Sequence, residues 1–216
     1  MSSIVYYVLD TETTGLKSNY NEITEIGIVR FADMRQLFTQ VKCEHPERAN
    51  YDALAITKKK LSDLSKGKNK EDAVAWCETF FAEDGLTPGH RCIVAHNAQF
   101  DRKFIHSLWE SCGKEFPADL WLCSMSLSRK YAKKTGIVKP KVNLHASCDM
   151  LQIKKVSEAH NAKVDSQNTF FLWKRLKDDG VVDYLADIKN VPHSIKPPAP
   201  TDDGLDIDFN EFVDQE

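Results

Sequence analysis

The sequence predicts an α/β fold in which helices flank a mixed β-sheet, and three observations support this fold class. Residues 4–9 form an unbroken apolar run with β-branched and aromatic members, which is typical of a strand buried on both faces. The patterns at 22–31 and 36–41 come soon after and predict an antiparallel three-strand meander with it. Beyond residue 71, helical patterns surround one short apolar strand at 91–95, so the sheet should add parallel strands to the meander.

Periodicity and turn residues place the other elements. The apolar stripe of a helix at 71–82 is broken by Asp84-Gly85, and the stripe at 100–112 is stopped by Gly113. In chain order we expect a polar loop at 42–50, a weakly helical segment at 51–64, helices at 71–82, 100–112 and 120–132, a basic loop at 133–141, a short helix at 143–151, a long helix at 158–176 and one more turn at 181–188.

The end of the chain differs in composition from the rest. We expect one domain over residues 1–188, followed at 189–216 by a proline-containing linker and an acidic tail that is flexible when free. Residues 201–216 carry seven acids and no Lys or Arg, which leaves 29 basic and 25 acidic residues before them. A mildly basic body is compatible with a polyanionic ligand. The tail also holds large apolar residues, so we expect it to dock on a protein partner, or to fold back on the body as an autoinhibitor.

Cysteine usage and hydropathy indicate the compartment. Six cysteines occur without a C-x-x-C pair, mostly inside apolar patterns, which favours reduced thiols in a cytoplasmic protein over a disulfide framework. No apolar run approaches the roughly 20 residues of a membrane span. The chain passes from Met1 almost directly into the first strand, so we expect no signal peptide and no membrane association.

The first strand ends in two carboxylates, Asp10 and Glu12, spaced so that both side chains leave the same face. Two carboxylates at the end of a buried strand repel each other unless a cation lies between them, and oxygen-only ligands suit Mg²⁺ or Mn²⁺. Gly15 then permits a tight turn, and Leu16 places an apolar side chain just beyond the charged residues. An isolated Asp-x-Glu is more often an ordinary strand before a polar turn, so its interpretation depends on residues further along the chain.

Two further motifs combine a histidine with an aspartate. His96-Asn97-Ala98-Gln99-Phe100-Asp101 lies where a strand meets a helix, and His160-Asn161-Ala162-Lys163-Val164-Asp165 opens the last long helix. Each aspartate taken alone has an ordinary explanation, since an acid near a helix N-terminus complements the helix dipole. We expect His96 and His145 to be structural histidines, and His160 taken alone would pass for a surface residue.

Taken in order, the motifs D-T-E-T-T-G-L, H-N-A-Q-F-D and H-N-A-K-V-D resemble those of the DEDDh exonucleases, the relatives of the epsilon proofreading subunit of bacterial DNA polymerase III, ribonuclease T and oligoribonuclease. The resemblance spans roughly residues 4–177 and implies a ribonuclease-H-like fold. It implies that Asp10, Glu12 and Asp165 hold a first Mg²⁺ or Mn²⁺ ion. Asp10 would also touch a second ion supported by Asp101, and His160 would be the general base.

The chemistry of phosphodiester hydrolysis is consistent with this set of four carboxylates and one histidine. Phosphodiester hydrolysis needs a nucleophilic hydroxide and a stabilised leaving alkoxide, which two metal ions supply together, and a neutral histidine can accept the proton of water. The resemblance also implies that Leu16 wedges between the last two bases. The residues that we expect to contact substrate come from the first two motifs: Thr13, Gly15, Leu16, Asn97 and Phe100.

The expected function is hydrolysis from the 3′ end of single-stranded or frayed DNA, releasing nucleoside monophosphates in proofreading or repair. An exoribonuclease that trims RNA or degrades short oligoribonucleotides is the alternative, because no residue clearly reads a 2′-hydroxyl. A nucleic-acid-binding scaffold of the same fold is the non-enzymatic alternative. The basic residues of the loop at 133–141 could contact a nucleic-acid backbone or be solvated.

Overall fold

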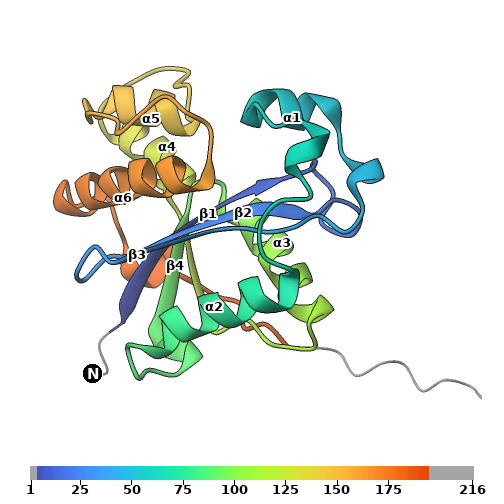
Figure 1. The fold of residues 1–216 in the computed structure, drawn as a ribbon. Coiled ribbons are helices and arrows are strands. Elements are labelled where there is room, and N and C mark those ends of the chain that lie inside the picture. The colour runs from blue at the N-terminus through green and yellow to red at the C-terminus, as the bar shows by residue number, and fades with distance from the viewer. Residues whose placement is uncertain (1–3, 195–216) are drawn as a thin grey trace, which may run out of the picture.

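The computed structural model describes residues 4–194 and contains a six-stranded mixed sheet (Figure 1). The central strand pairs antiparallel on one side and parallel on the other, which confirms the predicted combination of a meander with parallel strands. From edge to edge the strands are β3 (Gln36–Gln40), β2 (Ile23–Arg30), β1 (Val5–Thr13), β4 (Arg91–Ala95), β5 (Leu120–Cys123) and β6 (Lys189–Asn190).

Helices cover both faces of this sheet (Figure 1). One face packs against α4 (Ser124–Lys134), α5 (Leu144–Met150) and α6 (Ala162–Asp178), and the other against α2 (Lys70–Ala82) and α3 (Ala98–Ser111). The shorter elements are α1 (Tyr51–Thr57), α7 (Tyr184–Asp187) and three 3₁₀ turns at Pro46–Arg48, Leu61–Asp63 and Pro88–His90.

Successive side chains of β1 point to opposite faces of the sheet, so they belong alternately to the two layers of the core. Tyr7 and Leu9 of β1 are buried with α2 and α3, whereas Val8 between them is buried with α6. Each layer adds large aromatic side chains, such as Trp109 in α3 and Trp173 in α6, both fully buried. Burial on both faces is the reason that the first strand is an unbroken apolar run.

The helix predicted at 120–132 is wrong in its first turn. Residues 120–123 form β5, which pairs parallel with β4, and the helix begins only at Ser124. Four apolar residues in a row fit a buried strand as well as a helix, and the pairing partner that decides between them lies far away in the sequence. The long helix also begins later than predicted, at Ala162, so that His160 precedes it.

The first residues of the predicted linker, which is expected at 189–216, pack against the domain. Residues 189–190 form β6 against β5, and the His193 ring is buried, where its Nδ1 accepts a hydrogen bond of 2.8 Å from the backbone N–H of Phe116. The predicted acidic tail at 201–216 lies outside the described residues. Within residues 4–194, no helix is long and apolar enough to cross a membrane. The six cysteines are all free thiols, as predicted.

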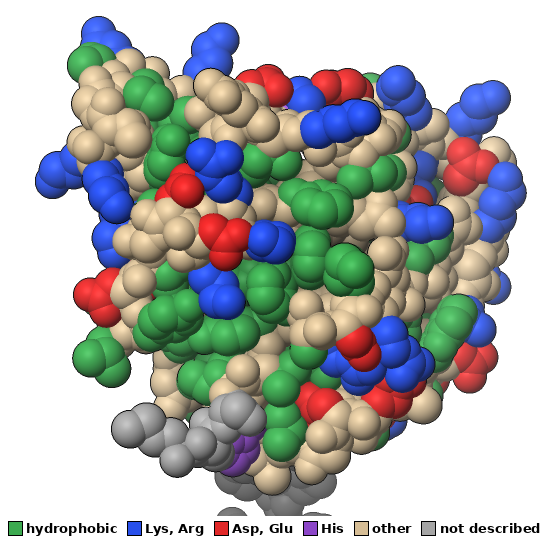
Figure 2. All heavy atoms as spheres, turned by 90° about the vertical axis from the view of Figure 1, so that its left-hand side faces the viewer, with side chains coloured by type: hydrophobic (Ala, Val, Ile, Leu, Met, Phe, Trp, Pro, Cys, Tyr) green, Lys and Arg blue, Asp and Glu red, His purple; other side chains and the backbone are tan. Residues whose placement is uncertain are grey.

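One face of the molecule exposes apolar side chains (Figure 2). A cavity of about 190 Å³ is lined by Val29 of β2, by Phe170 and Phe171 of α6, and by the exposed Met34 and Val156. Lys, Arg, Asp and Glu side chains are interspersed around the apolar surface in this view.

Candidate active site

Three carboxylates meet near the C-terminal end of β1. Asp10 and Glu12 lie on the same face of the strand, as their spacing predicts, and both are half-buried. Asp165 joins them from the first turn of α6, and the three residues offer oxygens that lie within 4.8 Å of one another. The first and third sequence motifs therefore form one cluster in space.

A glycine under the start of α6 makes this meeting possible. Gly27 of β2 pairs with Asp10 of β1, and a Cβ at position 27 would lie 2.0 Å from the carbonyl oxygen of Ala162. Any side chain at position 27 would push the helix away from the sheet. Asn161 caps the helix by accepting a hydrogen bond from a backbone N–H of the first turn, which fixes the position from which Asp165 reaches the strand.

Asp101 stands beside this cluster and is bound to the strand itself. It lies in the first turn of α3, is buried, and accepts hydrogen bonds at Oδ1 from the backbone N–H of Thr11 at 3.1 Å and from Thr11 Oγ1 at 2.9 Å. Asn97 makes the turn into α3 with a left-handed φ of 75°, a conformation that asparagine tolerates well. Asp101 is thus next to the three clustered carboxylates, with one oxygen already occupied by Thr11.

The protonation of these four carboxyls is strongly perturbed. Burial raises the pKa of Asp10 well above its ordinary value, and the charges of Asp101, Asp165 and Glu12 raise it further. Burial raises the pKa of Glu12 to about 8, that of Asp101 to about 7 and that of Asp165 to about 6. Four such groups cannot all ionise at neutral pH without added positive charge. Their oxygen-only donor set therefore fits hard divalent cations such as Mg²⁺ or Mn²⁺.

A fifth carboxylate, Glu25, supports the cluster and was not predicted. It lies opposite Glu12 on β2, is only 4% exposed, and accepts a hydrogen bond of 3.1 Å from the backbone N–H of Ala162 at the start of α6. Its other oxygen pairs with Lys59 Nζ at 2.5 Å. Glu25 therefore links β2, α6 and the segment after α1. The signal in the sequence was a single acid within an otherwise apolar strand pattern.

Two histidines, not one, accompany Asp165. His160 Nδ1 lies 3.8 Å from Asp165 Oδ2, and its side chain is 45% exposed. His145, predicted to be structural, instead faces the site from α5: its Nε2 lies 3.9 Å from Asp165 Oδ1, and its ring centre is 5.0 Å from that of His160. No pattern in the sequence pointed to this, because α5 is placed beside α6 only by packing of the sheet layer.

His96 does have the structural role predicted for it. Its Nδ1 lies 3.0 Å from Ser124 Oγ and its Nε2 lies 2.8 Å from the carbonyl oxygen of Val142. Burial lowers its pKa to about 4, so the ring is neutral at physiological pH. It ties the end of β4 to the loop before α5 and to the start of α4.

Leu16 is on the surface beside the carboxylates. Its side chain is 82% exposed, so it is not a core residue. It lines a cleft of about 190 Å³ together with Asn97 and Phe100, two of the residues predicted to contact substrate, and with Lys103. Leu16 and Phe100 together offer apolar surface to a flat ring in this cleft.

Thr13 and Gly15 shape the loop that carries Leu16. Thr13 is buried, and its Oγ1 donates a hydrogen bond of 2.6 Å to the carbonyl oxygen of Gly15. A Cβ on Gly15 would lie 2.6 Å from the side chain of Asn21, so the loop closes only with glycine. Contact of either residue with substrate stays a prediction.

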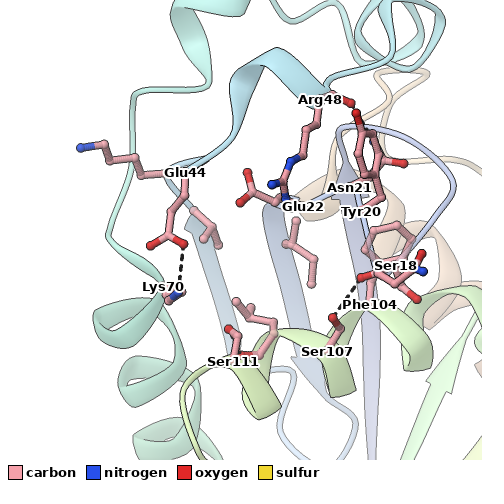
Figure 3. A pocket seen from close by; sticks show the side chains of 15 residues that line it. Ser18, Tyr20, Asn21, Glu22, Glu44, Arg48, Lys70, Phe104, Ser107 and Ser111 are labelled. Carbon is pink, nitrogen blue, oxygen red and sulfur yellow. Dashed lines mark hydrogen bonds and ion pairs between the residues drawn. The ribbon is translucent and has the colours of Figure 1, made fainter.

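A second cavity, of about 220 Å³, continues from this cleft along α3 (Figure 3). Both cavities are lined by Ser18 and Phe104, which places them side by side. In the second cavity the guanidinium of Arg48 lies over the ring of Tyr20, 5.4 Å from its centre. A partly exposed tyrosine paired with arginine is the kind of surface on which nucleobases stack.

The mixed sheet, with a carboxylate cluster at the end of its central strand, defines a ribonuclease-H-like fold with an acidic site. The chain belongs to the exonuclease family RNase_T, whose family model, described as "Exonuclease", matches residues 7–172. The matched range contains all three acidic motifs. The similarity to DEDD-type exonucleases that the motifs predicted is therefore confirmed.

The curated relatives include PolC-type DNA polymerases III. The PolC-type DNA polymerase III of Staphylococcus saprophyticus is 25% identical over 176 residues, and that of Listeria monocytogenes is 26% identical over 185 residues. Each match covers 82% of this chain but only 12% of the relative. The chain thus corresponds to a small part of these polymerases.

Solved structures share the fold at low identity. Cell-death related nuclease 4 superposes with a TM-score of 0.71 at 14% identity, covering 83% of this chain and 65% of that one. Exonuclease I of E. coli in complex with an oligonucleotide gives 0.69 at 18% identity, covering 85% and 43%. Exonuclease X in complex with 5′ overhanging duplex DNA gives 0.62 at 22% identity, covering 82% and 94%.

Proposed function

We propose that the protein is a metal-dependent 3′→5′ exonuclease that hydrolyses single-stranded DNA or frayed DNA ends and releases nucleoside monophosphates. The observation that carries this proposal is the convergence of Asp10, Glu12 and Asp165 within 4.8 Å, beside His160 and next to the cleft of Leu16. A binding scaffold would not need a costly cluster of buried acids, so retention of the full set favours an enzyme.

Asp10, Glu12 and Asp165 would hold a first Mg²⁺ or Mn²⁺ ion, and Asp10 with Asp101 a second. The raised pKa values of these carboxyls and the buried Asp165 Oδ1, which has no hydrogen-bond partner, fit such ligands. When bound, the ions would supply an activated water and charge stabilisation for the leaving oxygen. The protein holds the acids in place through Thr11 on one side and Glu25 on the other.

His160 would take the proton of the attacking water. It precedes α6 on an exposed segment, so its ring can reach solvent and pass the proton on. Leu16 and Phe100 would contact the terminal base in the cleft that they line. The Arg48–Tyr20 pair would stack on a neighbouring base further along α3. Lys103 lines the same cleft and could meet a phosphate.

DNA is the proposed substrate because the curated relatives are DNA polymerases and two structural neighbours are crystallised with DNA or an oligonucleotide. The similarity to these DNA polymerases and DNA-bound exonucleases also supports a role in proofreading or repair. Six free cysteines support a reducing, cytoplasmic location. Trimming of RNA is the second candidate, because the sequence offers no residue that clearly reads or rejects a 2′-hydroxyl.

The test is degradation of 5′-labelled single-stranded DNA and RNA of the same sequence, with Mg²⁺ or with a chelator. We expect a ladder that shortens from the 3′ end with DNA and Mg²⁺, and no products with chelator. Faster loss of RNA would establish the exoribonuclease. Binding of both strands without hydrolysis under any divalent ion would refute the enzymatic proposal.

A further inference from the structure

His145, His160 and Asp165 form a second possible ligand set that overlaps the carboxylate cluster. Their ligand atoms lie within 4.8 Å of one another. Asp165 stands between the rings, 3.9 Å from Nε2 of His145 and 3.8 Å from Nδ1 of His160. Ligands of one tetrahedral ion lie about 3.3–3.6 Å apart at Zn–N and Zn–O distances of about 2.0–2.2 Å, so each histidine nitrogen is only a few tenths of an ångström too far from Asp165.

Two of these polar atoms lack a hydrogen-bond partner. Nε2 of His145 and Oδ1 of Asp165 are buried without a hydrogen bond, and the Asp165 residue is only 7% exposed. Buried polar atoms are nearly always satisfied in folded proteins, because leaving them unpaired costs about 1–3 kcal/mol. Unpaired nitrogen and oxygen atoms that face one another are accounted for by an ion bound among them.

A carboxylate stands behind His145. Nδ1 lies 2.7 Å from Glu158 Oε2, an ion-pair distance at which a small rotation of the exposed Glu158 would align a hydrogen bond. Glu158 is itself held by Lys155 at 2.7 Å. A carboxylate on one nitrogen of a histidine fixes the other nitrogen as the metal ligand, which is the usual arrangement around zinc. Nε2, the nitrogen left free, is the one that points to Asp165.

The donor atoms decide which ion fits. Asp10, Glu12 and Asp165 offer only oxygen, which suits Mg²⁺ and Mn²⁺, whereas two imidazoles and one carboxylate suit Zn²⁺. Three protein ligands also leave a fourth position open for water. The same aspartate therefore belongs to two sets with different metal preferences.

We propose that His145, His160 and Asp165 bind Zn²⁺, and that zinc bound there switches the nuclease off. The inhibitory half of the proposal rests on the proposed function, because zinc would occupy both the general base His160 and the Mg²⁺ ligand Asp165. Zn²⁺ and Mg²⁺ then compete for Asp165, and inhibition weakens as Mg²⁺ is raised.

The site is tested first without nucleic acid, by calorimetric titration of Zn²⁺ into the metal-free full-length chain. We expect one zinc-binding event that weakens at least about tenfold in His145→Ala and in His160→Ala. The second variant guards against misfolding of the first, since His160 is half-exposed. His45→Ala is the matched control, because His45 belongs to a separate cluster with Glu22 and Glu44. Unchanged zinc affinity in both site variants, or its loss only in His45→Ala, would overturn the proposal.

The regulatory step is tested by zinc inhibition of Mg²⁺-supported hydrolysis, each variant being compared with its own zinc-free rate. We expect the zinc concentration for half inhibition to rise at least about tenfold in His145→Ala and not in His45→Ala. Equal zinc sensitivity of His145→Ala and the wild type would refute inhibition through this site. If the wild type hydrolyses nothing, the proposed function fails, while the calorimetric result still decides whether the zinc site exists.

Discussion

Replacing Asp165 by asparagine should make the metal-free protein more stable and the enzyme inactive. The carboxyl is buried, and its pKa is raised from 3.8 to about 6, mainly by burial. Once it is ionised, a carboxyl whose pKa is raised by this amount lowers the free energy of unfolding by about 3 kcal/mol. Asparagine has a similar shape and no charge, so it removes this cost.

The sign of the pH dependence is set by the direction of the pKa change. The folded-state pKa lies above the unfolded value, so the cost is complete above about pH 6 and vanishes below about pH 4. At pH 8 without metal, Asp165→Asn should melt about 6–12 °C higher than the wild type, since 1 kcal/mol corresponds to about 2–4 °C at this chain length. At pH 4 the two melting temperatures should converge.

Calorimetry or circular dichroism with chelator measures this difference, and adding Mg²⁺ should reverse it, because only the wild type keeps all ligands. Hydrolysis should fall by about 10²-fold or more in the variant. Asp178→Asn is the matched control on α6: that exposed acid pairs with Lys174 at 2.7 Å and has a lowered pKa, so its loss should not stabilise. A less stable Asp165→Asn protein at pH 8, or one with normal turnover, would refute the assignment of Asp165 as a metal ligand.

Single features of the structure support three further predictions, and the composition of residues 201–216 supports a fourth. His160→Ala should lower the hydrolysis rate about 10²–10⁴-fold while a binding assay shows intact substrate affinity; an unchanged rate would make His160 a surface residue. Leu16→Ala should slow digestion of single-stranded ends without lowering the melting temperature, because the side chain is 82% exposed; lower stability with normal activity would argue for a packing role. Gly27→Ala should lower both the melting temperature and activity, because its Cβ would lie 2.0 Å from the Ala162 carbonyl oxygen; unaltered values for both would show that α6 does not need this approach. Deletion of 201–216 should raise activity at low salt if the tail is autoinhibitory, or abolish recovery of a partner in a pull-down at constant activity if it docks; identical behaviour of the two chains would leave the tail as a solvated end.

What the sequence determined by itself is the chemistry that depends on short-range geometry. The strand period places Asp10 and Glu12 on one face whatever the rest of the chain does, and the third motif places Asp165 near the start of the last long helix. The unbroken apolar run before Asp10 indicated a strand that is covered on both faces, as in a sheet with helices on each side. The order of the three motifs then indicated the exonuclease family.

What only the tertiary structure decided involves contacts between distant segments. Glu25 meets the backbone of Ala162 and the side chain of Lys59, and His145 meets Asp165 across two helices. The strand at 120–123 likewise exists only because β4 lies beside it. Local periodicity carries no information about such partners, because they are chosen by how the layers pack on the sheet. A buried acid or histidine therefore acquires its role only when packing places another charge beside it.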